Sequence, residues 1–317
     1  MVLQLNGVEI EDTYAEAFDI WCVRPLITAV NEEWAKIIVN TFSGFAVSTI
    51  ACDCEAGIDS IVPKTETPDG RPGIAVILCA KRANLGKALM NRMGQCVLTA
   101  PTSAAFDWLG MEPDMYQKKE KDGTKVPTPA IFNTGGMLRY FGDGFEKKDT
   151  INGRTIWKIP VMEGEFVIEE KFKAKKGIAG GNFFVMGETA ENTLKAAKAA
   201  ADEMVKIKGV IASFPGGVCR SGSKTGSLKY SKFLHASTNH LFCPTLKNEA
   251  EGSSVPENVN CVLELVFNGF SVDLLKEATA AGIKAAVKVP GIKKITAGNY
   301  GGKLGKHNIY LKEVLGL

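Results

Sequence analysis

The sequence predicts an α+β protein built from two similar lobes. Three observations lead to this prediction: an internal repeat, a strand–helix order that recurs in both halves, and an ordinary globular composition. The chain has 317 residues, of which 45% are hydrophobic and 23% are charged. A chain of this length buries a large core and forms one large domain or two medium lobes.

The internal repeat begins with two similar segments. Residues 7–14 in the first half resemble residues 165–172 in the second half. An apolar run that predicts a strand follows each segment, at residues 24–29 and 182–186. Chance similarity between two α/β segments is the alternative interpretation. A true duplication predicts a ligand cleft between or beside the two lobes.

A helix is predicted after each apolar run. Apolar residues recur at helical spacing over residues 34–42 in the first copy and 194–205 in the second. Each predicted helix stops at a glycine, Gly44 or Gly209. Glycine suits the left-handed conformation that often follows a helix.

Each copy then continues with a strand and a second strand–helix–strand unit. The expected ranges in the first copy are a strand at 45–51, a strand at 73–80, a helix around 85–93 and a strand at 95–99. In the second copy they are a strand at 210–214, a strand at 260–267, a helix around 274–286 and a strand at 293–297. Two split strand–helix–strand units per copy are typical of a ferredoxin-like lobe. We expect lobes at residues 1–152 and 153–317, with a loop insertion at 107–138 that could also be an interface arm.

Composition argues against several classes of function. A net charge of +3 is too small to indicate nucleic-acid binding. No basic region followed by a long apolar run marks a secretory signal, and no apolar stretch is long enough to span a membrane. We therefore expect a cytoplasmic protein with reduced cysteines. Three histidines and a single Cys52-x-Cys54 pair offer few metal ligands, so we expect no metal site.

Glu264 is the leading catalytic candidate. It stands in the strand of residues 260–267, where both alternating faces are apolar, so the strand is expected to be buried on both sides. Burial raises the pKa of a carboxyl group, which suits a residue that carries a proton near neutral pH. The corresponding strand of the first copy has no charged residue between Ile74 and Leu78. A strand end or a solvent-facing position is the alternative.

Glycine-rich and polar segments in the second half are candidates for ligand binding. Glycine permits close backbone approach, and backbone N–H groups in such turns bind anions. The candidate binding residues are Asn182, Ser223, Lys224, Ser237, Thr238, Asn239, Asn299 and Lys303. Turns between strands and helix caps are the alternative interpretation of these segments. We discount a nucleophilic pair of Cys243 and His240.

These segments resemble the formylmethanofuran–tetrahydromethanopterin formyltransferase family over nearly the whole chain. The matching stretches lie in the same order and include residues 67–73, 94–102, 140–144, 157–161, 164–166, the glycine segments and 236–239. Two departures are His240, where an acidic residue is expected after Ser-Thr-Asn, and a longer stretch at 107–138.

The resemblance implies two ferredoxin-like lobes, a dimer or tetramer of identical subunits, and a cleft for both coenzymes. It also implies that formylmethanofuran and tetrahydromethanopterin are substrates and that no cofactor is tightly bound. The family's catalytic glutamate falls on Glu264. Carboxylate and phosphate tails of the coenzymes could meet Lys224, Lys303, Arg71 or Arg220. The alternatives are a non-catalytic coenzyme-binding or scaffold subunit of a larger complex, with His240 as the feature that suits lost activity, and a small-molecule sensor.

Overall fold

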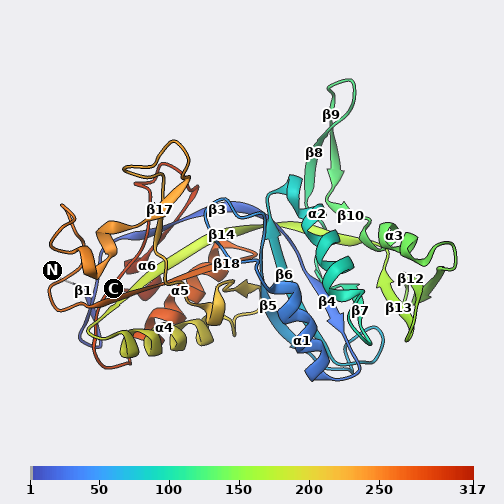
Figure 1. Cartoon of the computed structure of the whole chain (residues 1–317), viewed down its shortest axis with the longest axis horizontal. Coiled ribbons are helices and arrows are strands. Elements are labelled where there is room, and N and C mark those ends of the chain that lie inside the picture. The colour runs from blue at the N-terminus through green and yellow to red at the C-terminus, as the bar shows by residue number, and fades with distance from the viewer. Residues whose placement is uncertain (1–2) are drawn as a thin grey trace. The chain divides into compact units, whose positions relative to one another are not determined.

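The structure is a computed structural model that describes residues 3–317. Within it the chain forms two compact units, which we call unit 1 and unit 2 (Figure 1). Unit 1 comprises the chain up to Asp19, residues 47–52 and residues 178–317. Unit 2 comprises residues 20–46 and 53–177.

The central sheet of unit 2 has the ferredoxin-like strand order. Strand β4 lies between β6 and β7, β5 lies outside β6, and all neighbours are antiparallel. The chain order is strand, helix, strand, strand, helix, strand, as the sequence predicted. The elements are β4 (Pro25–Thr28), α1 (Glu32–Ser43), β5 (Glu55–Val62), β6 (Gly73–Ala80), α2 (Arg82–Arg92) and β7 (Ala104–Asp107).

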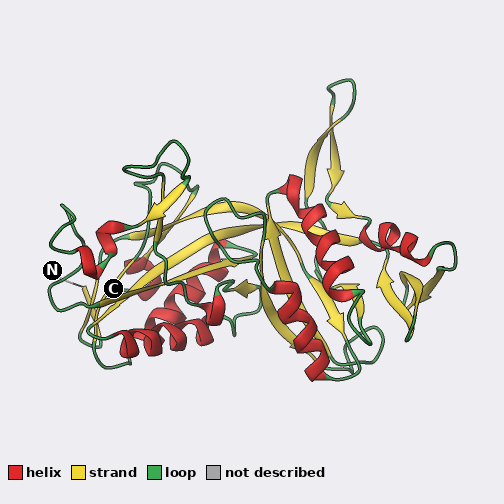
Figure 2. Cartoon of the chain, viewed as in Figure 1, coloured by secondary structure: helices red, strands yellow, loops and turns green. Residues whose placement is uncertain are grey.

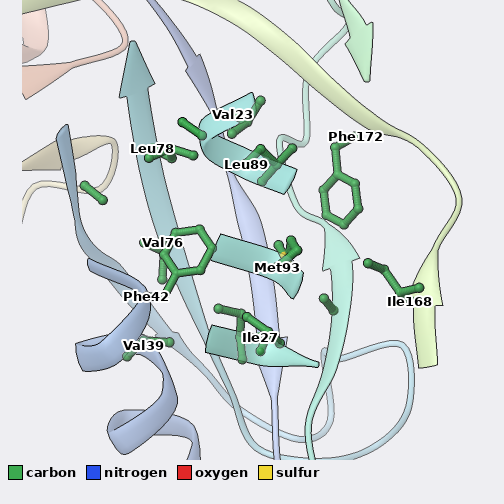
Figure 3. Packing of buried hydrophobic residues seen from close by; sticks show 14 of the residues in the cluster. Val23, Ile27, Val39, Phe42, Val76, Leu78, Leu89, Met93, Ile168 and Phe172 are labelled. Atoms are coloured by element: carbon green, nitrogen blue, oxygen red, sulfur yellow. The ribbon is translucent and has the colours of Figure 1, made fainter. Parts of the chain in front are cut away.

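The core of unit 2 lies between this sheet and its two helices. Figure 3 shows Phe42 of α1 and Leu89 of α2 packed against Val76 and Leu78 of β6. The exposed fraction of each of these four side chains is 0%. Asn31 caps the start of α1 by accepting a hydrogen bond from the Trp34 N–H at 2.9 Å.

Unit 1 repeats the same strand order. Strand β14 (Phe172–Gly187) lies between β18 and β19, β15 lies outside β18, and all neighbours are antiparallel. Helices α4 and α5 pack against one another on one face of this sheet (Figure 1). The other elements of the repeat are α4 (Ala190–Met204), β15 (Val210–Ile211), β18 (Cys261–Gly269), α5 (Val272–Ala286) and β19 (Ile292–Thr296). The ferredoxin-like fold of both lobes is therefore confirmed.

The short segments that began the repeat become the fifth strand of each sheet. β2 (Val8–Ile10) pairs in parallel with β19, and β13 (Gly164–Glu169) pairs in parallel with β7. The N-terminal segment thus belongs to unit 1, and its counterpart near residue 165 belongs to unit 2. Strands β3 (Tyr14–Val23) and β14 each carry the chain from one unit into the other. The units therefore differ from the expected lobes 1–152 and 153–317.

The remaining strands extend these sheets or form small ribbons. β1 (Leu3–Leu5) pairs with β2, and β20 (His307–Tyr310) pairs with the start of β3 and precedes α6 (Leu311–Leu315). β11 (Lys147–Ile151) and β12 (Arg154–Val161) continue the unit 2 sheet beyond β13. β16 (Ser223–Thr225) and β17 (Ala236–Thr238) form a separate hairpin in unit 1.

The stretch at 107–138 is more ordered than the expected inserted loop. It contains an antiparallel hairpin of β8 (Met115–Lys119) and β9 (Lys125–Pro129), visible as a separate ribbon in Figure 2. It also contains the two-residue strand β10 (Ile131–Phe132), which pairs with β14, and helix α3 (Thr134–Leu138). The hairpin side chains face solvent almost throughout.

Two predicted strands of the first copy are wrong. Residues 45–51 form a loop, because Phe45 and Ala51 adopt left-handed φ angles of 64° and 67°, which side chains other than glycine rarely adopt in a strand. Residues 95–97 belong to a π-helical segment, Met93–Val97, residues 98–99 form the turn after it, and the strands follow later as β5 and β7. Short apolar runs fit a buried strand and a buried turn equally well.

Helix α1 ends at Gly44 as predicted, but the conformation expected there and the stop expected at Gly209 are wrong. Gly44 has a φ of −57°, and the left-handed residue after α1 is Phe45. Gly209 has a φ of +91°, but α4 already ends at Met204. No helix of residues 3–317 is both long and apolar enough to cross a membrane.

Candidate functional site

Glu264 lies near the middle of β18, on the sheet face that the helices leave uncovered. Leu263, Leu265 and Phe267 point to the other face and belong to the core with α4 and α5. Because side chains alternate along a strand, Glu264 points away from the helices. Its face is covered by the long connection between β15 and β18, and the side chain is half-buried. We expected both faces of the strand to be buried. The face toward the helices is fully buried, and the face that carries Glu264 is partly buried.

Four residues lie side by side across this face. Glu264 is the direct partner of Phe184 on β14, and Phe184 is the direct partner of Thr296 on β19. On the other side, Cys219 and Glu264 exchange both backbone hydrogen bonds, at 2.8 and 2.9 Å. Directly paired residues of a sheet project from the same face, so the four side chains form a row.

A cavity of about 580 Å³ opens beside this row. Three of its walls come from successive segments of the chain: the connection after β15, the turn after β17 and the strand β18. The lining residues are Phe184, Cys219, Arg220, Ser221, Gly222, Asn239, Phe242, Cys243, Pro244, Thr245, Asn260, Cys261, Val262 and Glu264. Two predicted site residues, Glu264 and Asn239, therefore line one pocket.

The Glu264 carboxyl has the raised pKa that was predicted from its apolar strand. Burial raises the pKa of Glu264 to about 7. Within residues 3–317 burial is the only influence that shifts this pKa, and no hydrogen bond to the carboxyl offsets it. Near neutral pH the group is therefore divided between its neutral and ionised forms, which suits a proton donor or acceptor.

The hairpin of β16 and β17 carries four more predicted residues. Lys224 and Ser237 are direct partners, and the Lys224 ammonium donates to the Ser237 hydroxyl at 2.7 Å. Ser223 and Thr238 form the neighbouring pair. The Asn239 N–H donates to the Gly222 carbonyl at 2.6 Å, which joins the hairpin to the pocket rim.

Asn182 is a buried structural link. Its amide nitrogen donates to the carbonyl oxygens of Gly180 at 3.2 Å and Gly298 at 3.1 Å. Its amide oxygen accepts the Gly298 N–H at 2.6 Å. Both amide hydrogens are thus engaged, and the side chain ties the loop after β19 to β14.

The glycine-rich loop at residues 298–305 uses its N–H groups within the chain. Several of them donate to the carboxylate of Glu16, a residue of β3 that the sequence prediction missed. The signal was present, since Glu16 is an acid flanked by alanines in a mainly apolar strand. Asn299 donates to the Tyr14 carbonyl at 3.2 Å, and Lys303 lies on the exposed side of the loop.

Other candidates are placed differently. The Cys243 thiol contacts the Thr238 hydroxyl at 3.3 Å, and within the described residues it has no hydrogen bond to His240. Arg71 belongs to unit 2 and pairs with Asp69 at 2.8 Å. No group of three or more His, Cys, Asp or Glu residues in the described range is arranged to hold a metal ion.

Comparison with known proteins accounts for almost every residue of the chain. Residues 3–161 match the family described as formylmethanofuran-tetrahydromethanopterin formyltransferase. Residues 164–314 match the description "FTR, proximal lobe". The chain belongs to the formylmethanofuran–tetrahydromethanopterin formyltransferase family.

Members of this family are similar to the chain from end to end. The formyltransferase of Methanocaldococcus jannaschii is 50% identical, over 98% of this chain and 99% of the relative. That of Archaeoglobus fulgidus is 49% identical over 98% of this chain and 100% of the relative.

Two solved structures of the formyltransferase family share the fold. The enzyme from Methanosarcina barkeri matches with a TM-score of 0.88 at 48% identity, over 98% of this chain and all of that one. A chain of the formyltransferase/hydrolase complex of Methylorubrum extorquens, solved with methylofuran, matches with a TM-score of 0.87 at 37% identity, over 99% of both chains.

Proposed function

We propose that formyl transfer takes place in the pocket beside Glu264, with Glu264 as its proton-carrying residue. As a member of its family the chain is a transferase that moves a formyl group between formylmethanofuran and tetrahydromethanopterin. The observation that carries the proposal is a single carboxyl group with a pKa near 7 in the wall of a cavity of about 580 Å³.

The proposed reaction is a direct acyl transfer. A ring N–H nitrogen of the reduced pterin attacks the formyl carbon of formylmethanofuran, and a new C–N bond forms while the carbonyl π electrons move to oxygen. The old C–N bond then breaks, and methanofuran leaves as an amine. The proton lost from the pterin nitrogen equals the proton gained by the amine, so no oxidant or reductant is needed.

Glu264 has two roles in this scheme. Its neutral form donates a hydrogen bond to the oxyanion of the tetrahedral intermediate, where a preorganised donor lowers the barrier. The same proton then passes to the departing amine, and the proton released by the pterin nitrogen restores the neutral carboxyl of Glu264. A group with a pKa near 7 suits both roles, because it holds its proton at neutral pH and releases it readily.

Asn239 is the better placed of the two asparagine candidates for a second donor to the oxyanion. It lines the same pocket as Glu264. The Asn182 amide hydrogens already bond to Gly180 and Gly298, so that side chain supports the site through the loop that it holds.

The coenzyme tails are assigned to the polar rim. Lys224 and Arg220 lie on or beside the segment from 219 to 225 that borders the pocket, and cationic side chains bind carboxylate and phosphate groups. Ser223, Ser237 and Thr238 offer hydroxyl groups on the same hairpin. We assign Asn299 and Lys303, on the loop after β19, to the same role.

We further propose that the active form is a cytoplasmic homodimer or homotetramer whose partners are the two coenzymes. Joint binding of two large coenzymes supplies much of the acceleration, since orientation alone contributes several kcal/mol, to order of magnitude.

Replacing Glu264 by Gln tests the proposal. Glu264→Gln preserves shape but removes the transferable proton, so single-turnover transfer is expected to slow about 100-fold or more. Absorbance of the pterin product measures the rate. Glu188→Gln, at an exposed ion pair with Lys293, is the matched control and should transfer normally. Near-normal turnover of Glu264→Gln would remove Glu264 from the mechanism.

A non-catalytic role in a complex is the second candidate, favoured by the Methylorubrum extorquens relative, which was solved inside a formyltransferase/hydrolase complex. The isolated wild-type chain distinguishes the two candidates. Formylated pterin produced from both coenzymes supports the transferase, and coenzyme binding without product supports the scaffold.

A further inference from the structure

Glu16 is a buried carboxylate that the transfer chemistry does not use. It is 1% exposed, and its oxygens accept four backbone hydrogen bonds from one loop. The donors are the N–H groups of Tyr300 at 2.7 Å, Gly302 at 3.0 Å, Leu304 at 2.6 Å and Gly305. Burial raises the pKa of Glu16, but the four donors outweigh it and leave the pKa below its ordinary value. The carboxylate stays ionised and fixes the loop.

The start of the same loop is fixed to the wall of the pocket. The Asn182 amide nitrogen donates to the Gly298 carbonyl at 3.1 Å, and the Asn182 amide oxygen accepts the Gly298 N–H at 2.6 Å. A β-carbon placed on Gly298 would lie 3.1 Å from the Phe184 ring, so backbone and ring are in close contact. Phe184 is in turn the direct partner of Glu264. The loop is therefore anchored at both ends and borders the row that carries Glu264.

Tyr300 is the aromatic residue of this loop. Its half-buried ring packs edge-on against Phe18, with the ring centroids 6.2 Å apart. Burial raises the pKa of Tyr300, and the charges of Glu264 and Glu16 raise it further. The phenol therefore keeps its proton at neutral pH. Tyr300 follows Gly298 by two residues, and Gly298 contacts Phe184, the cross-strand partner of Glu264.

We propose that Glu16 and Tyr300 are positioning residues for Glu264: Glu16 fixes the loop beside the row that carries Glu264, and the Tyr300 O–H on this loop moves into hydrogen-bond range of the carboxylate that remains when Glu264 gives up its proton. This inference rests on the proposed function.

The need for such a donor follows from the surroundings of Glu264. After proton transfer the carboxylate is charged in a site that penalises charge, and within the described residues it has no hydrogen-bond donor of its own. A hydrogen bond to a charged group is stronger than one between neutral groups. The titratable and charged residues around the carboxyl are Cys219, Arg220, Cys243, Cys261 and Tyr300. Thiols are weak donors and Arg220 is exposed, so the phenol is the strongest neutral donor among them.

Tyr300→Phe tests the phenol, with Tyr310→Phe as the matched control. Tyr310 packs against Tyr14 in the same unit, with ring centroids 5.1 Å apart. Single-turnover transfer is measured against pH for both variants and for Glu264→Gln. Loss of the donor should slow transfer about tenfold or more and move the Glu264 inflection upward by about one pH unit, whereas Tyr310→Phe should match wild type.

The outcomes separate this inference from the proposed function. If Glu264→Gln transfers the formyl group at a near-normal single-turnover rate, the proposed function of Glu264 is wrong. A slow Glu264→Gln enzyme together with a Tyr300→Phe profile that matches Tyr310→Phe overturns the positioning role alone.

A double-mutant cycle tests Glu16. If Glu16 acts through Tyr300, Glu16→Gln slows transfer to a similar extent, and the double variant with Tyr300→Phe is no slower than the slower single variant. Asp19→Asn is the control, because Asp19 pairs with Lys306 at 2.7 Å next to the same loop. Additive losses in the Glu16 cycle would show that Glu16 does not act through Tyr300. Should Glu16→Gln fail to fold, the Tyr300 profile still decides the proposal.

Discussion

Phe184 and Glu264 are direct cross-strand partners, and the Phe184 ring also packs edge-on against Phe242 with centroids 4.8 Å apart. The ring therefore excludes water from one flank of the carboxyl. This arrangement connects the apolar packing of the sheet to the protonation of the candidate catalytic residue.

Phe184→Leu should lower the pH at which transfer declines. A smaller side chain admits water, which reduces the burial that holds the Glu264 pKa near 7 and moves it toward the ordinary value of 4.5. Because the neutral carboxyl is the active form, the rate should then fall at lower pH than in wild type. The measurement is the pH profile of single-turnover transfer.

The control for this prediction is Phe183→Leu. Phe183 is adjacent in sequence but belongs to the core on the helix side of the sheet. This change should reduce stability without moving the pH profile. Equal shifts in the two variants would contradict a specific role for the Phe184 ring.

Lys224→Met should weaken coenzyme binding with little effect on the chemical step. The ammonium is held by Ser237 at the pocket rim, where a charged contact contributes about 1 kcal/mol. We therefore expect KM to rise about fivefold while kcat stays nearly constant. Lys303→Met tests the second predicted cation in the same assay.

The control here is Lys312→Met, at an exposed position of α6. It removes one positive charge from unit 1 outside the rim. If Lys224→Met, Lys303→Met and Lys312→Met raise KM equally, the effect comes from the overall charge of the unit. Lys224 would then have no specific role in coenzyme binding.

Asp107→Asn should stabilise the protein at alkaline pH. Burial and the nearby charge of Glu169 raise the pKa of Asp107 to about 7, well above its unfolded value. The folded state therefore binds the proton more tightly, so wild-type stability falls as pH rises from about 4 to 7. At pH 8 the variant should exceed wild type by on the order of 1–4 kcal/mol, and near pH 4 the two should be similar.

Asp114→Asn provides a control of opposite sign. Burial of Asp114 is outweighed by the Lys176 N–H and the Lys175 ammonium, which lower its pKa. Its contribution is present at neutral pH and is lost as the pH falls, so the variant should be less stable at neutral pH. Chemical denaturation across this pH range measures both effects. An Asp107→Asn protein that is less stable than wild type at pH 8 would refute the prediction.

Much of the local structure could be predicted because it depends on short patterns. Helical spacing located α1, α4 and α5, and long apolar runs located β6, β14 and β18. Residues 45–51 and 95–99 were mistaken for strands, because a short apolar run is buried equally well in a turn. Glu264 was predicted on the same basis, as one acid in an apolar strand.

The role of the glycine loop could not be predicted in this way. Its sequence indicates backbone N–H groups available for an anion, and the structure supplies that anion from Glu16, 284 residues from Tyr300 in the chain. Asn182 likewise bonds to Gly298 across 116 residues. A local sequence pattern does not show which distant residue will accept the hydrogen bond of a given N–H group.

The duplicated strand–helix order and the isolated carboxyl of Glu264 can be read from the sequence alone, because both follow from periodicity and polarity along a few residues. The tertiary structure alone decided that β2 pairs with β19 and β13 with β7, so that each unit combines segments from both halves of the chain. It also decided which residues surround Glu264. Strand pairing and burial are long-range, since the free energy of a hydrogen bond or an apolar contact depends on proximity in space and not on separation along the chain.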